Sequence, residues 1–270
     1  MIITRSIRNM MLVLAATLLS AACSRKEESP VDARVTLQAT LADALQTRAI
    51  TDGSAVDQVW CGAYLAGTLI TEATAPVQAG AATLVLDLAN NRTYDIVMWA
   101  CKAGENAVWT VNPAKAEVSA DYTKETASSA ANDAFWYKGT LVPSGEKAVA
   151  IELTRAVAQI LVGTSNTFTT ATDVVVNVTS VPSSWNLLTG AMDGAADRSF
   201  SLGSAPAAET FGMGDATYNC LAAVSVLAPE AQTTVNISFS LQMDGTPVTK
   251  SVANTAIRRN WCTRIAGDIK

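Results

Sequence analysis

The sequence predicts an all-β protein built from two tandem antiparallel β-sandwich domains. Apolar and polar residues alternate with a period of two in one segment after another, which is typical of half-buried strands. Turn-forming clusters such as Asp52-Gly53-Ser54 and Asn90-Asn91 separate these segments. The chain has 270 residues, of which 49% are hydrophobic and only 16% charged, and no segment has the periodicity of an amphipathic helix. This length is sufficient for two domains.

The alternating segments of the first half predict an N-terminal domain over residues 35–143. Val35, Leu37 and Leu41 share one face of its first strand, while polar residues occupy the other face. The same alternation recurs in residues 59–65, 84–88 and 94–100. Residues 127–134 are less periodic and indicate a loop or a single helical turn. A cluster of turn residues, Pro143-Ser144-Gly145-Glu146-Lys147, marks the expected boundary.

The second half predicts a C-terminal domain over residues 144–270. Its expected strands are residues 149–162, 174–178, 200–202, 221–227, 235–243 and 256–269. Residues 190–197 lie between two of them and have the composition of a loop. Asp244-Gly245 predicts a tight hairpin turn, because this dipeptide tolerates the positive φ angles that such turns require.

Several classes of function are excluded or disfavoured by composition. The chain contains no histidine, so it can build neither a Ser–His–Asp triad nor a zinc site with imidazole ligands. It has no phosphate-binding loop, dinucleotide fingerprint or calcium loop. The net charge is −5, without the clustered Lys and Arg that phosphate neutralisation needs. We therefore expect no catalytic residues, no metal or other cofactor, and no nucleic-acid partner.

Residues 1–22 have the pattern of a bacterial lipoprotein signal peptide. Arg5 and Arg8 precede an apolar run that is too short to span a membrane, and Ser20-Ala21-Ala22 leads directly to Cys23. This ending resembles a lipobox, although Leu19 stands one step earlier than that motif favours. The resemblance implies cleavage before Cys23 and acylation of its thiol. The alternative is ordinary signal cleavage with an unmodified cysteine.

Residues 23–34 are expected to form a tether between the acylated Cys23 and the folded part. Lys26-Glu27-Glu28 resembles the surface-export tag of Bacteroidota lipoproteins, and otherwise forms a solvated charged spacer. The predicted location is the outer membrane, on the cell surface, with Cys23 inserted in its lipid.

Several stretches together resemble the fimbrillin-like lipoproteins of Bacteroidota. They are Leu45-Gln46-Thr47-Arg48-Ala49-Ile50, Tyr94-Asp95-Ile96-Val97-Met98-Trp99-Ala100, Asn132-Asp133-Ala134-Phe135-Trp136, Leu153-Thr154-Arg155-Ala156-Val157-Ala158-Gln159-Ile160 and Arg259-Asn260-Trp261-Cys262-Thr263-Arg264-Ile265-Ala266-Gly267. The resemblance implies two Greek-key, transthyretin-like sandwich domains. It also implies a structural or adhesive role at the cell surface, with some family members assembling into fimbriae by strand exchange with other subunits.

In polymerising members of that family, a protease cuts after an arginine in an early loop and a neighbour's strand fills the vacated groove. Thr47-Arg48-Ala49 fits this position, so the resemblance implies a cut between Arg48 and Ala49. The segment that the cut would release includes residues 35–41, and the cut would also detach the acyl anchor. The alternative is that Arg48 is an uncut loop residue.

The last predicted strand carries Ile265 and Ile269, and no further alternating segment follows that could be donated to a neighbour. We therefore expect a terminal or accessory fimbrial subunit or adhesin, or a monomeric relative. The alternative is that residues 259–270 themselves serve as donor. The sequence does not identify an adhesion ligand.

Four cysteines remain in the mature chain, two in each predicted domain. Because exported proteins retain disulfides, we predict the bonds Cys61–Cys101 and Cys220–Cys262. Four cysteines allow three connectivities, and four independent buried thiols are the other alternative. A four-thiolate metal site is disfavoured because no two cysteines are close in sequence.

The second functional interpretation is a glycan-binding surface lipoprotein of a nutrient-uptake system. Its candidate stacking residues are Trp109, Trp136 and Trp185, whereas Trp60 and Trp99 are expected in the core. The low aromatic content of 6% weakens this interpretation. Arg155 is expected to form hydrogen bonds at a buried sheet edge.

Overall fold

The computed structural model describes residues 32–42, 53–125, 132–206 and 209–269. As predicted, these residues form an all-β protein, with nineteen strands, two short 3-10 helices and no α-helix in the described part. None of the described segments is a helix of sufficient length and hydrophobicity to span a bilayer. The residues from Asp32 onward form one compact unit.

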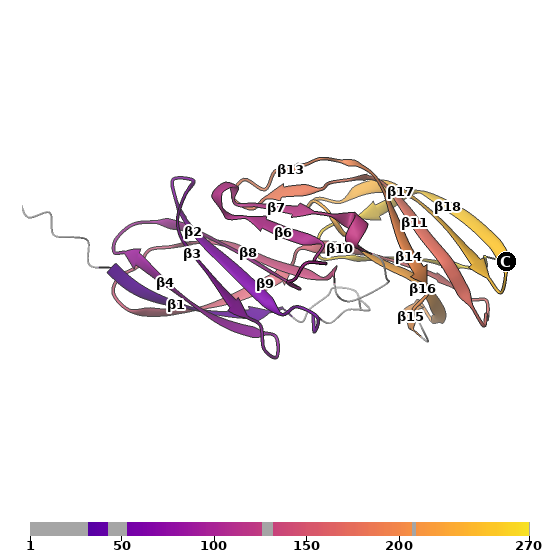
Figure 1. The fold of residues 1–270 in the computed structure, drawn as a ribbon, viewed down its shortest axis with the longest axis horizontal. Helices are drawn as coiled ribbons and strands as arrows, with labels where there is room; N and C mark the ends of the chain where they lie inside the picture. The colour runs from indigo at the N-terminus through magenta and orange to yellow at the C-terminus, as the bar shows by residue number, and fades with distance from the viewer. Residues whose placement is uncertain (1–31, 43–52, 126–131, 207–208, 270) are drawn as a thin grey trace, which may run out of the picture. The chain divides into compact units, whose positions relative to one another are not determined.

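A seven-stranded sheet contains the N-terminal strands in the order β3-β2-β5-β8-β9-β1-β4 (Figure 1). The bounds are β1 (Asp32–Leu41), β2 (Gln58–Leu65), β3 (Thr68–Pro76), β4 (Ala81–Ala89), β5 (Tyr94–Cys101), β8 (Ala134–Leu141) and β9 (Lys147–Arg155). Adjacent strands are antiparallel except β1 and β9, which are parallel. The end strands β3 and β4 contact each other, and a bridge between Gln78 and Ala81 lies in the turn that joins them, so the sheet nearly closes into a barrel.

Period-two alternation places one face of each strand in the core of this sheet. Leu84, Leu86 and Leu88 of β4 are buried, while the residues between them are exposed. The predicted strands at 35–41, 59–65, 84–88 and 94–100 all lie within strands of this sheet. The alternation predicts these strands because one face of each strand packs against the apolar side chains that the sheet encloses.

Three four-stranded sheets contain the remaining strands, in the orders β15-β16-β10-β19, β14-β11-β17-β18 and β13-β12-β7-β6. The first has β10 (Val157–Thr164), β15 (Thr210–Met213), β16 (Ala216–Leu227) and β19 (Cys262–Gly267). The second has β11 (Ala171–Val181), β14 (Ala196–Ser204), β17 (Thr233–Met243) and β18 (Thr246–Ile257). The third has β6 (Trp109–Asn112), β7 (Glu117–Ala120), β12 (Ser184–Asn186) and β13 (Met192–Asp193). The helices are η1 (Pro113–Lys115) and η2 (Tyr122–Lys124).

The predicted hairpin at Asp244-Gly245 is confirmed between β17 and β18. Both residues have positive φ angles, 50° and 78°, as a two-residue turn of this kind requires. The Asp244 carboxylate also accepts hydrogen bonds from the backbone N–H groups of Thr169 and Thr170, at 2.8 and 2.9 Å. The turn is therefore joined to the loop that precedes β11.

Strand pairing crosses residue 143, the expected domain boundary. β9 follows this position but pairs with β8 and β1, while β7 precedes it and pairs with β12. Along the chain, the change from the seven-stranded sheet to the next sheet occurs at Ala156, between β9 and β10. The tandem-sandwich arrangement with domains 35–143 and 144–270 stays a prediction.

A row of aromatic rings connects several sheets through edge-to-face contacts. Trp99 of β5 contacts Trp109 and Trp185 with ring centroids 5.8 and 6.0 Å apart. Tyr122 contacts Trp109 at 6.1 Å and Phe200 at 5.5 Å. Such pairs contribute about 0.5–1.5 kcal/mol each beyond the burial of their area. These contacts join β5, β6, β12 and β14 in one core.

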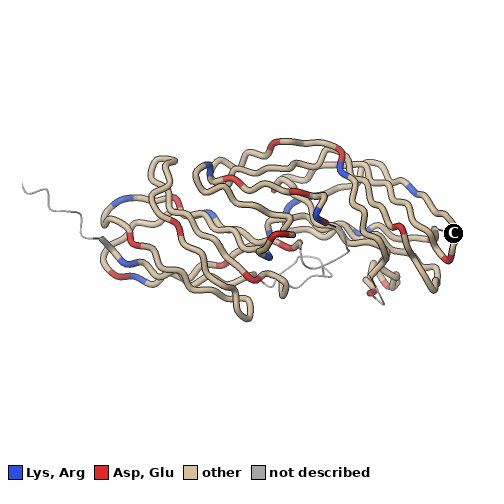
Figure 2. Tube along the Cα trace, viewed as in Figure 1, with Lys and Arg blue, Asp and Glu red and all other residues tan. Residues whose placement is uncertain are grey.

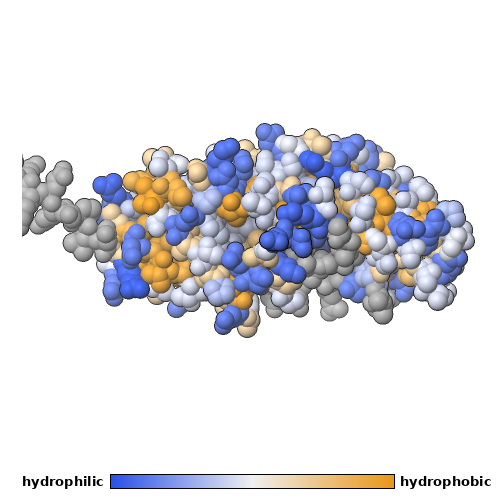
Figure 3. Space-filling view, viewed as in Figure 1, coloured by the Kyte–Doolittle hydropathy of each residue, from blue (hydrophilic) through white to orange (hydrophobic). Residues whose placement is uncertain are grey.

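Charged residues are sparse along the chain and interspersed in sign (Figure 2). The face shown in Figure 3 accordingly mixes hydrophilic and hydrophobic areas, without one broad region of either kind. This pattern is in keeping with a chain in which uncharged polar residues supply much of the surface.

Candidate functional site: the first strand and its groove

The predicted lipidation site and the predicted processing site lie outside the described residues. Cys23 precedes the first described residue, and Arg48 and Ala49 fall in the gap between residues 42 and 53. The strand that a cut after Arg48 would release is β1, which is described in full. The geometry of β1 therefore determines what such a cut would do.

Both edges of β1 are paired. It forms nine antiparallel residue pairs with β4, from Asp32↔Ala89 to Thr40↔Ala81. It forms seven parallel pairs with β9, from Val35↔Lys147 to Leu41↔Leu153. Loss of β1 would leave β4 and β9 with unpaired edges facing one another, and such edges readily accept another strand.

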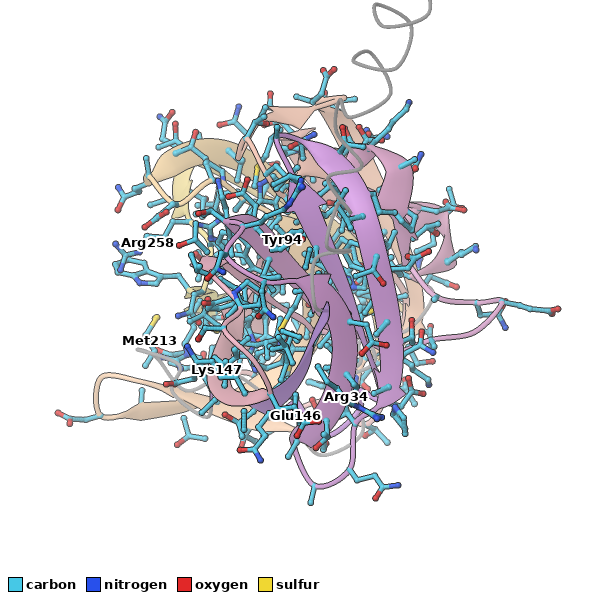
Figure 4. All side chains as sticks on the ribbon, turned by 90° about the vertical axis from the view of Figure 1, so that its left-hand side faces the viewer. Arg34, Tyr94, Glu146, Lys147, Met213 and Arg258 are labelled. Carbon is cyan, nitrogen blue, oxygen red and sulfur yellow. The ribbon has the colours of Figure 1, made fainter. Side chains whose placement is uncertain are left out.

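The inward face of β1 carries small and medium apolar side chains. Ala33, Val35, Leu37 and Ala39 are all 3% exposed or less. Leu41, predicted to belong to the same face, is half-buried. Arg34 lies on the outward face, on the side of the molecule shown in Figure 4. At about 1.5–3 kcal/mol per fully buried large aliphatic side chain, Val35 and Leu37 contribute roughly 3–6 kcal/mol.

The predicted disulfides do not form in the structure: Cys61, Cys101, Cys220 and Cys262 make no disulfide among the described residues. Cys61 is paired in register with Met98, three residues before Cys101, which is about 10 Å along the strand. The two thiols also belong to different apolar clusters, so Cys61–Cys101 exceeds the reach of a disulfide.

Cys220 and Cys262 are separated by a whole strand. They lie on β16 and β19, on opposite sides of β10, where Cys220 is aligned with Gly163 and Cys262 with Gln159. Burial raises the pKa of Cys61, Cys101 and Cys220 to about 12 and that of Cys262 to about 11. These thiols stay protonated at neutral pH, so they are poor nucleophiles.

The burial of the tryptophan side chains agrees only in part with the prediction. Trp60 and Trp99 are buried, as expected, with exposed fractions of 8% and 1%. Trp109 and Trp185 are buried too, so they are core residues and cannot be sugar-stacking surfaces. The Trp109 indole N–H donates to the Asn132 carbonyl at 2.9 Å, which satisfies its polar atom internally. Trp136 alone among the three candidates is half-exposed.

Arg155 forms more than the expected edge hydrogen bonds. Its guanidinium is bonded to the carboxylate of Asp133, and both side chains are buried. Two of the family-like stretches, around residues 133 and 155, thus meet between β8 and β9.

Within the described part of the chain, no group of three or more His, Cys, Asp or Glu residues is arranged to hold a metal ion. The described geometry that bears on the predicted processing is β1 itself, which is paired on both edges and buried on its inward face.

The profile of a protein family of unknown function, DUF6562, matches residues 26–269. The chain belongs to this family. No curated protein is similar to this DUF6562 member in sequence.

Several solved structures with a similar fold are proteins of Bacteroidota. A candidate adhesin from Bacteroides thetaiotaomicron is 12% identical, with a TM-score of 0.54 over 84% of this chain and 82% of that chain. Candidate polysaccharide-binding proteins from the same species give 10% identity and a TM-score of 0.52 over 87% and 90%. A fimbrial assembly protein from Parabacteroides distasonis gives 13% and 0.50 over 88% and 91%. The resemblance to fimbrillin-like proteins is thus confirmed at the level of fold.

Proposed function

We propose that this DUF6562 member is a non-catalytic cell-surface lipoprotein with a structural or adhesive role, acting as an accessory or terminal fimbrial subunit. The observation that carries the proposal is the position of β1. This strand precedes Arg48 in the sequence and lies in the interior of the sheet, between β9 and β4. The adhesin and fimbrial descriptions of proteins with the same fold support this role.

The proposed cycle begins with lipidation of Cys23 and export to the outer-membrane surface. A cut between Arg48 and Ala49 then separates β1 from the rest of the chain. Burial of Val35 and Leu37 alone represents roughly 3–6 kcal/mol, against a total stability of about 5–15 kcal/mol for a typical domain. The cut protein therefore depends on a strand from another subunit to pair with β4 and β9.

The last strand is less suited to act as a donor. β19 forms six parallel pairs with β10, and the Thr263 hydroxyl donates to the Ala256 carbonyl at 2.7 Å. Beyond it, Ile269 is buried and its N–H donates to the Asn166 side chain at 3.0 Å. Donation of β19 would break these contacts, so a role in which β19 stays in the protein's own fold, such as that of a terminal subunit, is favoured.

The test is the N-terminal residue of the mature protein on cells. We expect a fraction that starts at Ala49, and we expect Arg48→Ala to abolish this fraction while leaving chains that start at Cys23. The matched control is Arg34→Ala, which removes an exposed arginine of β1 and should leave processing unchanged. Fatty-acid labelling should disappear in Cys23→Ala. Mature protein that starts only at Cys23 in every variant would refute the processing step.

A further test separates terminal from stalk subunits. Purified Arg48-cleaved protein is concentrated alone and examined by gel electrophoresis without heating. Monomers and short species are expected. Long SDS-resistant ladders would show that the chain donates a strand to its own copies and would contradict the terminal role.

Glycan binding is the second candidate function, and one observation favours it in a narrower form. Trp136 is half-exposed and lines a cavity together with Trp261 and three arginines.

A further inference from the structure

A cavity of about 330 Å³ opens beside β8 and β9 and the turn that follows β18. Its main side chains are Trp136, Arg155, Glu230, Arg258, Arg259 and Trp261. Arg258 lies at the margin of the molecule in Figure 4, so the cavity is accessible from solvent. The volume is at the lower end of the range for small-molecule sites, which fits a single sugar unit rather than a long segment of a polymer.

Two of the arginines are held in place by stacking on indole rings. The Arg258 guanidinium lies 3.6 Å from the ring centroid of Trp261. The Arg259 guanidinium lies 4.5 Å from the ring of Trp136 and 4.7 Å from that of Trp185. Trp185 is itself 1% exposed and fixed in the aromatic core. The guanidinium groups are therefore pre-organised, which lowers the entropic cost of binding a ligand.

The cavity is positively charged in a chain whose net charge is −5. Three arginines line it, whereas Glu230 is its only lining carboxylate. Asp133 forms an ion pair with Arg155, and Glu230 forms one with Arg259 at 2.8 Å. The Arg259 side chain is only 11% exposed, but its partner Glu230 is 87% exposed, so Glu230 can move into solvent and a ligand carboxylate can take its place.

The arginine and tryptophan side chains of the cavity favour different chemical groups that one ligand can carry. A planar guanidinium binds a carboxylate through two parallel hydrogen bonds. The negative face of an indole ring attracts the positively polarised C–H groups of a sugar ring. A phosphate polymer would need a string of cations along a groove, and the charges of the chain are sparse and mixed in sign (Figure 2). The combination of charge, indoles and size therefore favours an acidic sugar.

We propose that this cavity binds a carboxylate-bearing sugar, a uronic or sialic acid at the end of a saccharide, through Arg258, Arg259, Trp136 and Trp261. The inference rests on the proposed adhesive role for its biological meaning and gives that role a ligand class. Binding itself can be measured on the purified full chain, independently of lipidation and processing.

The experiment titrates the purified full chain with a panel of oligosaccharides that carry a uronic or sialic acid, followed by tryptophan fluorescence and calorimetry. The methyl esters of the same saccharides are the matched ligands, because they keep the sugar ring and remove the charge. We expect binding of at least one acid, with at least tenfold weaker binding of its ester. Equal binding of acid and ester, or no binding of any acid in the panel, would overturn the proposal.

Variants with opposite expected effects assign the binding to this cavity. Arg258→Ala and Trp261→Ala should weaken binding at least tenfold, and Arg258→Lys should recover part of it. Glu230→Gln should strengthen binding several-fold, because it releases Arg259 and removes a repulsive carboxylate. Arg92→Ala, an exposed arginine in the turn between β4 and β5, is the control and should change nothing.

Each variant is first shown to unfold at the wild-type temperature, so a loss of binding does not report misfolding. Equal effects of Glu230→Gln, Arg258→Ala and Arg92→Ala would show that the charge of this cavity is not used. The proposed surface role is tested separately, by the lipid label on Cys23 and by the N-terminal residue of the cell-surface protein. These two measurements do not depend on sugar binding.

Discussion

Arg155 and Asp133 form a bidentate ion pair in which both side chains are buried. Arg155 Nε lies 2.7 Å from Asp133 Oδ1, and Nη2 lies 2.6 Å from Oδ2. The side chains are 5% and 1% exposed, and the guanidinium lies 5.1 Å from the ring of Phe135. The pair joins the beginning of β8 to the end of β9, beside the point where the chain enters its next sheet.

Removal of one partner of this pair should be costly. Asp133→Ala leaves a buried guanidinium without its counterion, and we expect a loss of about 3–5 kcal/mol in the free energy of unfolding, measured in urea. The comparison is Glu230→Ala at the pair with Arg259, where the carboxylate is 87% exposed and the arginine 11% exposed, and we expect a smaller loss than for Asp133→Ala. Similar losses in the two variants would mean that burial does not set the strength of the first pair.

The buried Glu125 should make stability depend on pH. Burial raises the pKa of this carboxyl from 4.5 to about 8, although Ser225 N–H donates to it at 3.1 Å. The folded protein then binds more protons than the unfolded chain between these pH values. Stability from this group is complete below about pH 4.5 and falls as the pH rises to about 8.

Glu125→Gln should therefore be more stable than wild type at pH 9, by up to a few kcal/mol, with the difference vanishing toward pH 4.5. Glu105→Gln, an exposed carboxylate, is the control and should run parallel to wild type. Urea unfolding at several pH values measures all three proteins. A difference between Glu125→Gln and wild type that does not change with pH would contradict the buried, proton-binding carboxyl.

Cys61, Cys220 and Cys262 are buried and Cys101 is half-buried, so the thiols should be shielded from reagents without forming disulfides. In protein with Cys23→Ala, exported to an oxidising compartment, we expect almost no reaction with a thiol reagent in the native state at pH 8. Four thiols should react after unfolding in urea without reductant, because the register separates both predicted pairs. Two or no reactive thiols after unfolding would instead indicate disulfides.

The inward face of β1 should be far more sensitive than its outward face. Leu37 is fully buried opposite Leu84 and Val149, so Leu37→Ala should cost about 2–5 kcal/mol. Gln38→Ala, at the next position and exposed, should change stability by less than about 0.5 kcal/mol. Urea unfolding of both variants provides the comparison. Equal effects would mean that β1 contributes little to the core, and the groove would then have no need of a replacement strand.

Some strands with one buried face were predictable from sequence, whereas β3 and β8 were not predicted. β1 and β4 alternate clearly because their outward faces contact water, and the Asp244-Gly245 turn carries its own local signal. β10 is buried at every position, so its sequence predicts burial but not which sheet it joins. The change of sheet at Ala156 depends on the partners of β9, which local periodicity does not encode.

The separation of the cysteines and the burial of Trp109 and Trp185 could not be predicted for a related reason. A disulfide depends on strand register, and the three-residue offset between Cys61 and Cys101 is a property of the pairing of β2 with β5. Trp136 lies in β8 and Trp185 in the three-residue strand β12, and tertiary contacts bury Trp185. The one available signal for the cavity was the run Arg258-Arg259-Asn260-Trp261, where cations and an aromatic ring are adjacent in sequence.

The parallel pairing of β1 with β9 has a consequence for the order of assembly. Val35 lies beside Lys147, so one edge of the first strand has no partner until more than a hundred further residues have joined the fold. Contacts of such long sequence separation form slowly, because a large loop must close before they contribute. During folding, β1 can pair with β4 while its edge toward β9 is still unpaired. The position that a foreign strand would occupy in the mature protein is therefore also the one that the chain itself completes late.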